Sequence, residues 1–298
     1  MQSRRRVLYD PAVISDRLTV AGIPVPSFVY GTAWKELETE RLTRLALEAG
    51  FRGIDTANQR RHYHEAGVGA AIQAAIADGL VTRDELFIQT KFTSVGGQDH
   101  RLPYDPRADD ATQVRQSFAS SLEHLGVERI DSYVLHGPSG GIGLNASDLA
   151  VWAAMEALHA AGQTRFIGVS NVDLDQLELL CERARTPPSF VQNRCFARNG
   201  WDAEIRAFCR ERGLVYQGFS LLTANIAHLR TPAFAEIVRR VGRTPAQVVF
   251  RFALQVGMQP LTGTKDPAHM REDLGIYGFE LAPADVRLVE DIAGAQGG

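Results

Sequence analysis

The chain has 298 residues, of which 45% are hydrophobic, and its 32 basic and 35 acidic side chains leave a formal net charge of −3. This composition allows a large core, and the near-neutral balance argues against a nucleic-acid or membrane-surface role. The cysteines Cys181, Cys195 and Cys209 form no CxxC pair, so we expect no metal site, no disulfide framework and a cytoplasmic location.

The sequence also lacks two targeting patterns. The basic residues at the N-terminus are not followed by an apolar run typical of a signal peptide. No stretch of about 20 apolar residues is present, so no membrane span is predicted.

The first predicted element is a short hairpin in "RLTVAGIPVP", with its turn near Gly22. After it, apolar runs rich in β-branched and aromatic residues alternate with amphipathic helical patterns. Eight such runs follow in chain order: "SFVYGTA", "FRGIDTA", "ELFIQTKF", "IDSYVLHG", "RFIGVSN", "SFVQNRC", "LVYQGFS" and "MQPLTGT". Several helical patterns stop at a glycine, a common helix end.

This alternation predicts an α/β fold, namely a closed (β/α)8 TIM barrel. The N-terminal β-hairpin precedes the barrel, and "PAHMREDLGI" and "APADVRLVEDIA" predict extra C-terminal helices. No Pro/Gly/Ser linker divides the chain, so we expect a single domain over residues 1–298. The irregular stretch "TSVGGQDHRLPYDPRADD" is long enough to be a lid or binding loop.

Ionisable side chains follow three successive predicted strands: Asp55, Lys91 and His136. The carboxyl ends of barrel strands build the active site, so these residues should meet there. Each has an ordinary alternative, which is a helix cap, an exposed lysine or a core histidine. Three different ionisable types on successive strands favour a catalytic site.

The stretches "GFRGIDTA", "FIQTK", "DSYVLHGP" and "FIGVSN" together resemble the aldo-keto reductase family, and the resemblance runs from "GTAW" to "HMREDL". It implies a barrel that binds a nicotinamide cofactor without a Rossmann domain, and that reduces an aldehyde or ketone to an alcohol. The catalytic set carried over is Asp55, Tyr63, Lys91 and His136, without a metal.

The segment "NQRRHYHE" departs from the family pattern, because the position five residues after Asp55 is Arg60. Tyr63 is the only tyrosine in the segment and is assigned the acid role, with His62 as the alternative. We expect Asn58 to His62 to bulge at the pocket rim, so that Tyr63 still hydrogen-bonds Lys91.

The residue types suit carbonyl reduction, which needs a hydride on carbon and a proton on oxygen. A free phenol has a pKa of about 10, and a neighbouring ammonium would lower it. Lys91 is expected to act on Tyr63 in this way, with Asp55 holding Lys91. His136 would orient the substrate oxygen.

The resemblance also implies cofactor contacts along the chain. Residues for the ribose, the nicotinamide and the pyrophosphate are Thr32, Ala33, Ser170, Asn171, Gln192, Phe219, Ser220 and Leu222. Residues for the 2′-phosphate and adenine are Thr264, Lys265, His269, Glu272 and Asp273. His269 stands where the family often has an arginine, which weakens the case for NADP(H) over NAD(H) without removing it.

Two other functions stay open. A Schiff-base aldolase would use Lys91 as a neutral amine, although Asp55 should keep it charged. An NADP-binding regulatory or sensor protein with slow turnover would tolerate the unusual spacing to Tyr63. The expected partner is a small-molecule carbonyl substrate, and neither its identity nor the oligomeric state is predicted.

Overall fold

The structure is a computed structural model that describes residues 15–294. The basic N-terminal residues considered for a signal peptide lie outside the described residues. The predicted hairpin is present as β1 (Arg17–Val20) and β2 (Ile23–Pro26), which pair antiparallel. Its turn residues Ala21 and Gly22 both have positive φ, at 49° and 85°. A two-residue turn of this hand matches the twist of the strands it connects.

The barrel is also confirmed: eight strands close in the order β10-β3-β4-β5-β6-β7-β8-β9. They are β3 (Val29–Gly31), β4 (Gly53–Asp55), β5 (Phe87–Phe92), β6 (Ile130–Leu135), β7 (Thr164–Ser170), β8 (Phe190–Arg194), β9 (Val215–Phe219) and β10 (Met258–Thr262). Each corresponds to one apolar run of the sequence. The pairings from β3 to β7, and that of β9 with β10, are parallel.

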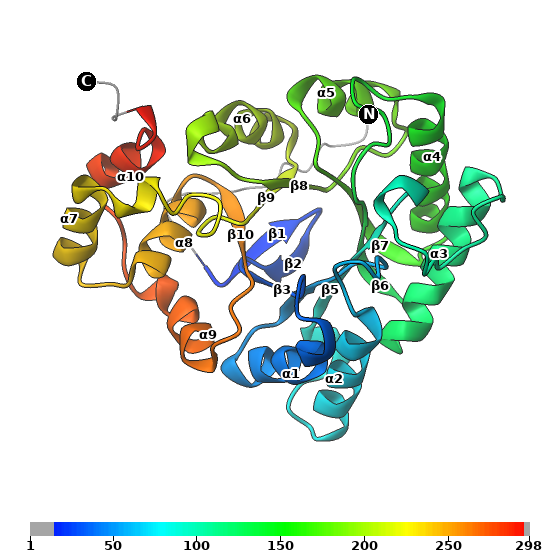
Figure 1. Cartoon of the computed structure of the whole chain (residues 1–298), viewed down its shortest axis with the longest axis horizontal. Coiled ribbons are helices and arrows are strands. Elements are labelled where there is room, and N and C mark those ends of the chain that lie inside the picture. The colour runs from blue at the N-terminus through cyan, green and yellow to red at the C-terminus, as the bar shows by residue number, and fades with distance from the viewer. Residues whose placement is uncertain (1–14, 295–298) are drawn as a thin grey trace. The chain divides into compact units, whose positions relative to one another are not determined.

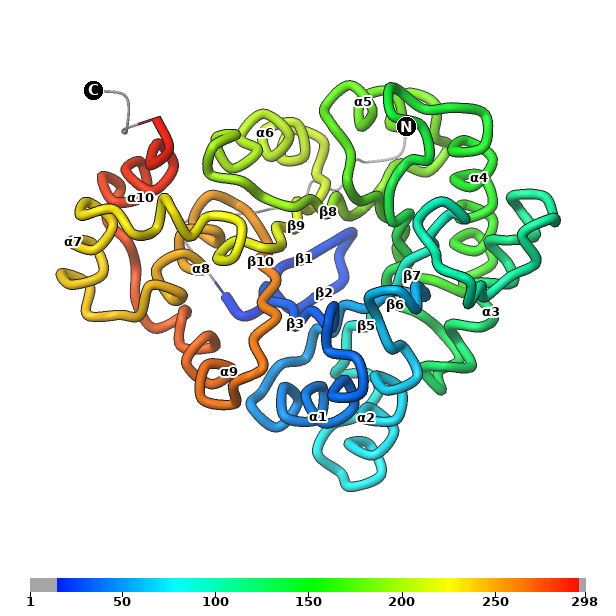
Figure 2. The backbone as a smooth tube through the Cα atoms, in the orientation of Figure 1, coloured from blue at the N-terminus to red at the C-terminus, as the bar shows by residue number. Residues whose placement is uncertain are grey.

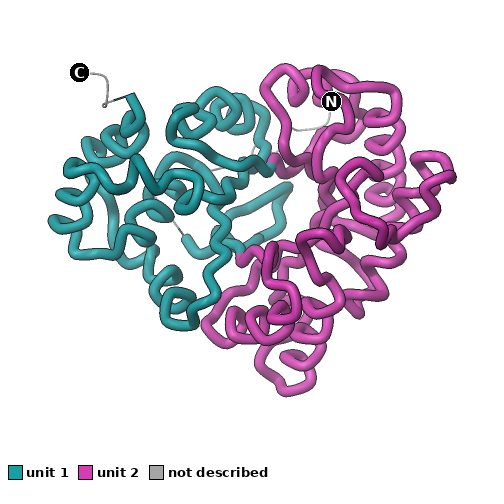
Figure 3. Tube along the Cα trace, in the orientation of Figure 1, with its two compact units in different colours: residues 1–29, 192–298 teal, residues 30–191 magenta. Residues whose placement is uncertain are grey.

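The chain divides into two compact units (Figure 3). The central unit comprises residues 30–191. The second, here called the terminal unit, comprises the described residues up to Val29 and from Gln192 onward. That the whole chain is a single domain stays a prediction.

In the central unit, each helix returns the chain to the start of the next strand. The helices are α1 (Thr39–Ala49), α2 (Glu65–Ala77), α3 (Asp110–Leu125), α4 (Ala146–Ala160) and α5 (Leu174–Arg183). Consecutive helices from α1 to α4 pack against one another (Figure 1). At the end of α1, Gly50 has φ 117°, so a residue with a side chain would be strained there.

The segment from Thr93 to Asp109, between β5 and α3, is the longest connection of this unit (Figure 2). It contains a short 3-10 helix, Val95–Gly97. Tyr104 is buried within it and donates a hydrogen bond to the carbonyl of Thr93 at 2.7 Å. The connection therefore folds back onto the end of β5. Asp109 caps α3 by accepting from the amide of Thr112.

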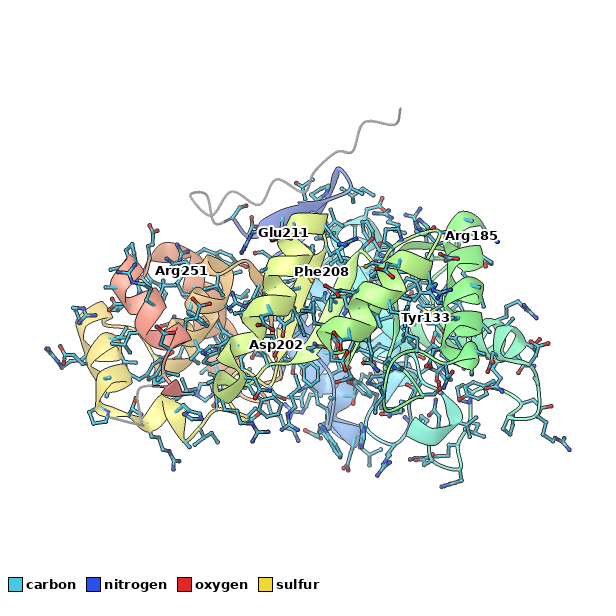
Figure 4. All side chains as sticks on the ribbon, turned by 90° about the horizontal axis from the view of Figure 1, so that it is seen from above. Tyr133, Arg185, Asp202, Phe208, Glu211 and Arg251 are labelled. Atoms are coloured by element: carbon cyan, nitrogen blue, oxygen red, sulfur yellow. The ribbon has the colours of Figure 1, made fainter. Side chains whose placement is uncertain are left out.

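In the terminal unit the helices are α6 (Ala203–Arg212), α7 (Pro232–Val241), α8 (Pro245–Gln255), α9 (Pro267–Asp273) and α10 (Pro283–Glu290). The extra C-terminal helices α9 and α10 confirm the sequence prediction. Figure 4 shows Asp202 at the start of α6, with Phe208 and Glu211 along the helix. Buried Trp201 precedes α6 and donates to the carbonyl of Val289 at 2.8 Å, which ties α10 to this segment.

Short 3-10 helices complete the described secondary structure: Glu36–Glu38, Arg83–Glu85, Val95–Gly97, Ala197–Asp202, His228–Arg230 and Leu274–Gly278. Between residues 15 and 294, no helix combines the length and the apolar character needed to cross a membrane.

Candidate active site

The site centres on a buried ion pair between Asp55, at the end of β4, and Lys91 of β5. Lys91 Nζ donates to both carboxylate oxygens at 2.7 Å and to the carbonyl of Thr56 at 2.8 Å. All three ammonium protons therefore have acceptors. Gln89, two residues before Lys91 on the same face of β5, also donates to Asp55 Oδ1 at 2.8 Å.

Two effects act on the charge of Lys91. Burial lowers its pKa, because a low-dielectric interior disfavours the ammonium. The carboxylate of Asp55 acts in the opposite direction, through its charge and its hydrogen bonds. Since the carboxylate accepts from the ammonium with both oxygens, we describe the pair as ionic, which argues against a neutral, imine-forming lysine.

Tyr63 lies beside this pair, as the sequence predicts. Lys91 Nζ is 5.2 Å from the centroid of the Tyr63 ring. The ring of His136 meets Tyr63 edge-on, with centroids 5.9 Å apart. The structure thus brings the four predicted catalytic side chains together within the central unit. In the described part of the chain, however, no hydrogen bond joins Tyr63 Oη to Lys91. The ammonium of Lys91 donates to Asp55 and to the carbonyl of Thr56 instead.

The predicted lowering of the Tyr63 pKa is wrong for this structure. Burial raises the pKa of Tyr63, and the negative charge of Asp55 raises it further. The physical reason is that burial disfavours the charged phenolate, and the nearby negative charge of Asp55 disfavours it further. Tyr63 is therefore a fully protonated phenol across the physiological range.

The inserted segment before Tyr63 is only partly a rim bulge. Asn58 and Gln59 were expected to bulge but are buried, because Asn58 Nδ2 donates to the carbonyl of Ser117 in α3 at 3.0 Å. The amides of His62 and Tyr63 donate to the carbonyl of Gln59, which makes one helical turn. A helical turn advances about 1.5 Å per residue instead of about 3.3 Å, so the coil takes up the extra length and Tyr63 stays over Lys91.

The long connection after β5 holds this segment in place. Gln98 Nε2 donates to the carbonyl of Asn58 at 2.8 Å, and Gln59 Nε2 donates to the carbonyl of Gly97 at 2.7 Å. Arg101 donates to the carbonyl of Arg60 at 2.9 Å. The two loops are therefore joined by three hydrogen bonds from side chain to backbone.

Two aromatic side chains from this loop region stack on each other. The Trp34 and His62 rings have centroids 4.0 Å apart, and the Trp34 amide donates to the His62 carbonyl. Trp34 has φ 61° and is 61% exposed, so a large apolar ring is held in a strained position facing solvent. This pair is a surface on which a planar substrate group could stack.

His136 follows β6 and is held through its backbone and its ring. Its amide donates to the carbonyl of Phe92, and its carbonyl accepts from Asn171 Nδ2 at 2.7 Å. Its Nδ1 is 2.7 Å from the hydroxyl oxygen of Thr93. Burial, followed by the charge of Lys91, lowers the pKa of His136 to about 3. The imidazole is therefore neutral at physiological pH.

The central unit carries four of the predicted cofactor-binding residues. Thr32 is buried, and its hydroxyl donates to the carbonyl of Asp55 at 2.9 Å. Ala33 is the next residue and is partly exposed. Asn171 has φ 54° and donates to Ser170 Oγ at 3.1 Å as well as to His136. Ser170 and Asn171 thus share a hydrogen-bond network with His136.

In the terminal unit, Gln192 of β8 begins a ladder of amides. Its Nε2 donates to Gln217 Oε1 at 3.0 Å, and Gln217 Nε2 donates to Gln259 Oε1 at 2.7 Å. Gln259 Nε2 in turn donates to the carbonyl of Pro26 at the end of the hairpin. The ladder fixes the orientation of the Gln192 carboxamide, the group predicted to bind the nicotinamide.

The other predicted nicotinamide and pyrophosphate residues follow β9. Phe219, Ser220 and Leu222 are all partly exposed. Ser220 has φ 58°, and its carbonyl accepts from the amide of Ala224. A left-handed residue directly after a barrel strand is typical of a functional turn.

The predicted 2′-phosphate residues lie around the start of α9. Lys265 and His269 are exposed, and His269 Nε2 is 3.9 Å from Asp266 Oδ2. Thr264 Oγ1 accepts from the amide of Asp266 at 3.2 Å. Two basic side chains and a hydroxyl thus gather within a few residues.

The two residues predicted to face the adenine, Glu272 and Asp273, differ in solvent exposure. Glu272 is exposed, whereas Asp273 is buried and accepts from Thr262 Oγ1 at 2.8 Å. Burial raises the pKa of Asp273 to about 6.

The sequence reasoning missed Gln89 and Thr93, although a signal for both was present. Each is two residues from Lys91, and strand side chains two apart point to the same face. The set of Gln89, Lys91 and Thr93 therefore forms an inward stripe that contacts Asp55 and His136.

Comparisons with known proteins agree with this geometry. The model of the aldo/keto reductase family matches residues 29–293. An aldo-keto reductase of Mycolicibacterium vanbaalenii is 33% identical over 246 residues, which cover 83% of this chain and 80% of that protein. Prostaglandin F synthase 1 of Bos taurus is 26% identical, with 90% of this chain and 88% of its own length covered.

A solved structure is similar as well. The crystal structure of an aldo/keto reductase from Brucella melitensis superposes with a TM-score of 0.79 at 24% identity. The match covers 93% of this chain and 98% of that one. At this identity the match supports the fold.

Proposed function

The chain belongs to the aldo/keto reductase family and is therefore an NAD(P)H-dependent oxidoreductase acting on carbonyl groups, and we propose that Tyr63 is its proton donor and NADPH its preferred cofactor. The observation that carries the proposal is the position of Tyr63 beside both Lys91 and His136. The reaction would convert a small aldehyde or ketone to the corresponding alcohol.

Each side chain has one task in this reaction. The reduced nicotinamide, when bound, supplies the hydride to the carbonyl carbon. Tyr63 gives its hydroxyl proton to the carbonyl oxygen as negative charge develops there, and is left as a phenolate. Its raised pKa keeps the proton on Tyr63 until that moment, and an alkoxide is basic enough to take it.

The neighbouring groups stabilise the developing charge. Neutral His136 can donate a hydrogen bond to the carbonyl oxygen, which orients the substrate and offsets negative charge. Lys91 lies close to Tyr63 and supports the phenolate once the proton has left. Asp55 keeps Lys91 in place and charged. The site is thus preorganised before substrate binds.

Two sets of residues would hold the cofactor. Gln192, Ser170 and Asn171 offer amide and hydroxyl groups suited to the carboxamide of the nicotinamide. Lys265 and His269 are the basic residues suited to a 2′-phosphate, and their exposure supports this role. A cytoplasmic location is proposed too, supported by the three cysteines, which form no disulfide in the described chain.

A spectrophotometric assay tests the proposal. NADPH or NADH is mixed with a panel of aliphatic and aromatic aldehydes and ketones, and cofactor oxidation is followed. We expect turnover with NADPH and a higher kcat/KM than with NADH. An enzyme that binds NADPH but turns over no member of the panel would point instead to the sensor function.

The aldolase alternative is tested on the same protein. Borohydride would trap a carbonyl substrate covalently on Lys91 if an imine forms. We expect no trapped adduct, because the ammonium of Lys91 is engaged by Asp55 and Thr56. An adduct in the wild type that is missing in Lys91→Met would overturn the reductase mechanism.

A further inference from the structure

Thr93 places a hydroxyl group against the ring of the catalytic histidine. Its Oγ1 is 2.7 Å from His136 Nδ1, and this is the only hydrogen-bond partner of that hydroxyl among residues 15–294. Thr93 directly follows β5, two residues after Lys91, and its side chain is buried. The contact therefore lies directly after the strand that carries the lysine.

Counting protons decides which atom donates in this contact. A threonine hydroxyl has one proton to donate, and a neutral imidazole has one N–H and one bare nitrogen. If Nδ1 carried the ring proton, the buried hydroxyl of Thr93 would have no acceptor for its own. If Thr93 donates to a bare Nδ1, both groups are satisfied and the ring proton lies on Nε2.

The surrounding loop holds Thr93 in position for this bond. Its carbonyl accepts from Tyr104 Oη at 2.7 Å and from Gln98 Nε2 at 3.3 Å. Gly97 lies so close that a Cβ there would be 2.7 Å from Thr93 Cγ2. The long connection after β5 thus packs against Thr93 and restricts its side chain.

The backbone of His136 is also held by hydrogen bonds. Its amide donates to the carbonyl of Phe92, and its carbonyl accepts from Asn171. With backbone and Nδ1 both fixed, Nε2 is the ring nitrogen left to face a substrate oxygen.

We propose that Thr93 is a positioning residue that fixes His136 as its Nε2–H tautomer, so that the ring presents a hydrogen-bond donor to the carbonyl oxygen of the substrate. The catalytic consequence rests on the proposed function, whereas the tautomer does not. The alternative tautomer would present a lone pair to that oxygen and repel it.

The first test reads the tautomer directly. Long-range ¹⁵N–¹H NMR of the ¹⁵N-histidine-labelled protein at pH 7 distinguishes the two neutral forms, and His136→Asn assigns the signal. We expect a single Nε2–H form in the wild type and in Thr93→Ser. We expect a mixture or the Nδ1–H form in Thr93→Val, which keeps the shape but lacks the hydroxyl.

The second test reads catalysis in the same variants. Thr93→Val should lower kcat by roughly tenfold, the scale set by leaving a buried polar group unsatisfied, whereas KM should change little. Thr93→Ser should restore most of the rate. Thr43→Val is the matched control, because Thr43 is also buried and its hydroxyl has no hydrogen-bond partner within residues 15–294; it should change neither readout.

The outcomes separate the two proposals. An Nδ1–H form in the wild type, or the same tautomer and rate in Thr93→Val, would overturn the role of Thr93. Absence of carbonyl reduction by the wild type would overturn the proposed function, while the NMR spectra would still decide the tautomer.

Discussion

Replacing Lys91 with methionine removes the ammonium but keeps an unbranched side chain of similar size. Lys91 is fully buried and Asp55 is 3% exposed, so the variant leaves a carboxylate in the interior without its cation. Breaking a buried ion pair in this way costs about 3–5 kcal/mol. Gln89, which donates a hydrogen bond to Asp55, is uncharged and cannot balance the charge. We therefore expect a loss of this size in the free energy of unfolding.

Urea denaturation at pH 7 measures the loss, with Arg239→Met as the control. Arg239 pairs with Glu236 at 2.6 Å, but both side chains are at least half exposed, so this pair should contribute at most about 1 kcal/mol. The double variant Asp55→Asn/Lys91→Met should recover at least half of the loss, because it leaves no buried charge. Equal losses in Lys91→Met and Arg239→Met would refute the reasoning.

The same variant should show a characteristic pH dependence. A buried carboxylate without a cation favours its protonated form, so folded Lys91→Met binds a proton more readily than its unfolded chain does. Stability then rises as the pH falls from 7 to 5. A flat profile for the variant would contradict a buried, charged Asp55.

Three further outcomes follow from the geometry. Lys265→Ala combined with His269→Ala should weaken NADPH binding by about threefold to tenfold and leave NADH binding unchanged in a fluorescence titration; equal effects would remove these residues from the 2′-phosphate. Gln217→Leu should weaken binding of either cofactor by a similar factor, since it removes a hydrogen bond that orients the Gln192 carboxamide; unchanged affinity would exclude that role. The reduction rate should stay flat from pH 7 to 9, because the raised pKa of Tyr63 keeps its proton in place; a decline there would mean that another acid acts.

The sequence predicted the barrel, and the proximity of Asp55 and Lys91, because both depend on local patterns. Apolar runs alternate with amphipathic helices, and ionisable residues stand directly after the runs. Asp55 and Lys91 could thus be placed at neighbouring strand ends and expected to pair, which they do. Glycine helix ends such as Gly50 and Gly126 were equally visible, because left-handed residues at those positions favour glycine.

Features that depend on long-range partners could not be predicted. Asn58 looked like a rim residue, but its amide is satisfied by Ser117, 59 residues away in the chain. The pKa of Tyr63 depends on burial and on its distance from the charge of Asp55, neither of which a sequence records. Thr93 could have been suspected from strand periodicity, yet its contact with His136 requires the actual register of β5 and β6.

The most direct test of the central claim is the kcat of Tyr63→Phe for NADPH-dependent reduction of a good aldehyde substrate, measured beside NADPH affinity. The variant loses the donated proton and almost no binding surface. We expect kcat to fall by about 10²–10⁴-fold, the usual contribution of a positioned acid, with the NADPH dissociation constant unchanged. A variant that retains a near-wild-type kcat would contradict the account, and His62 or His136 would then have to supply the proton.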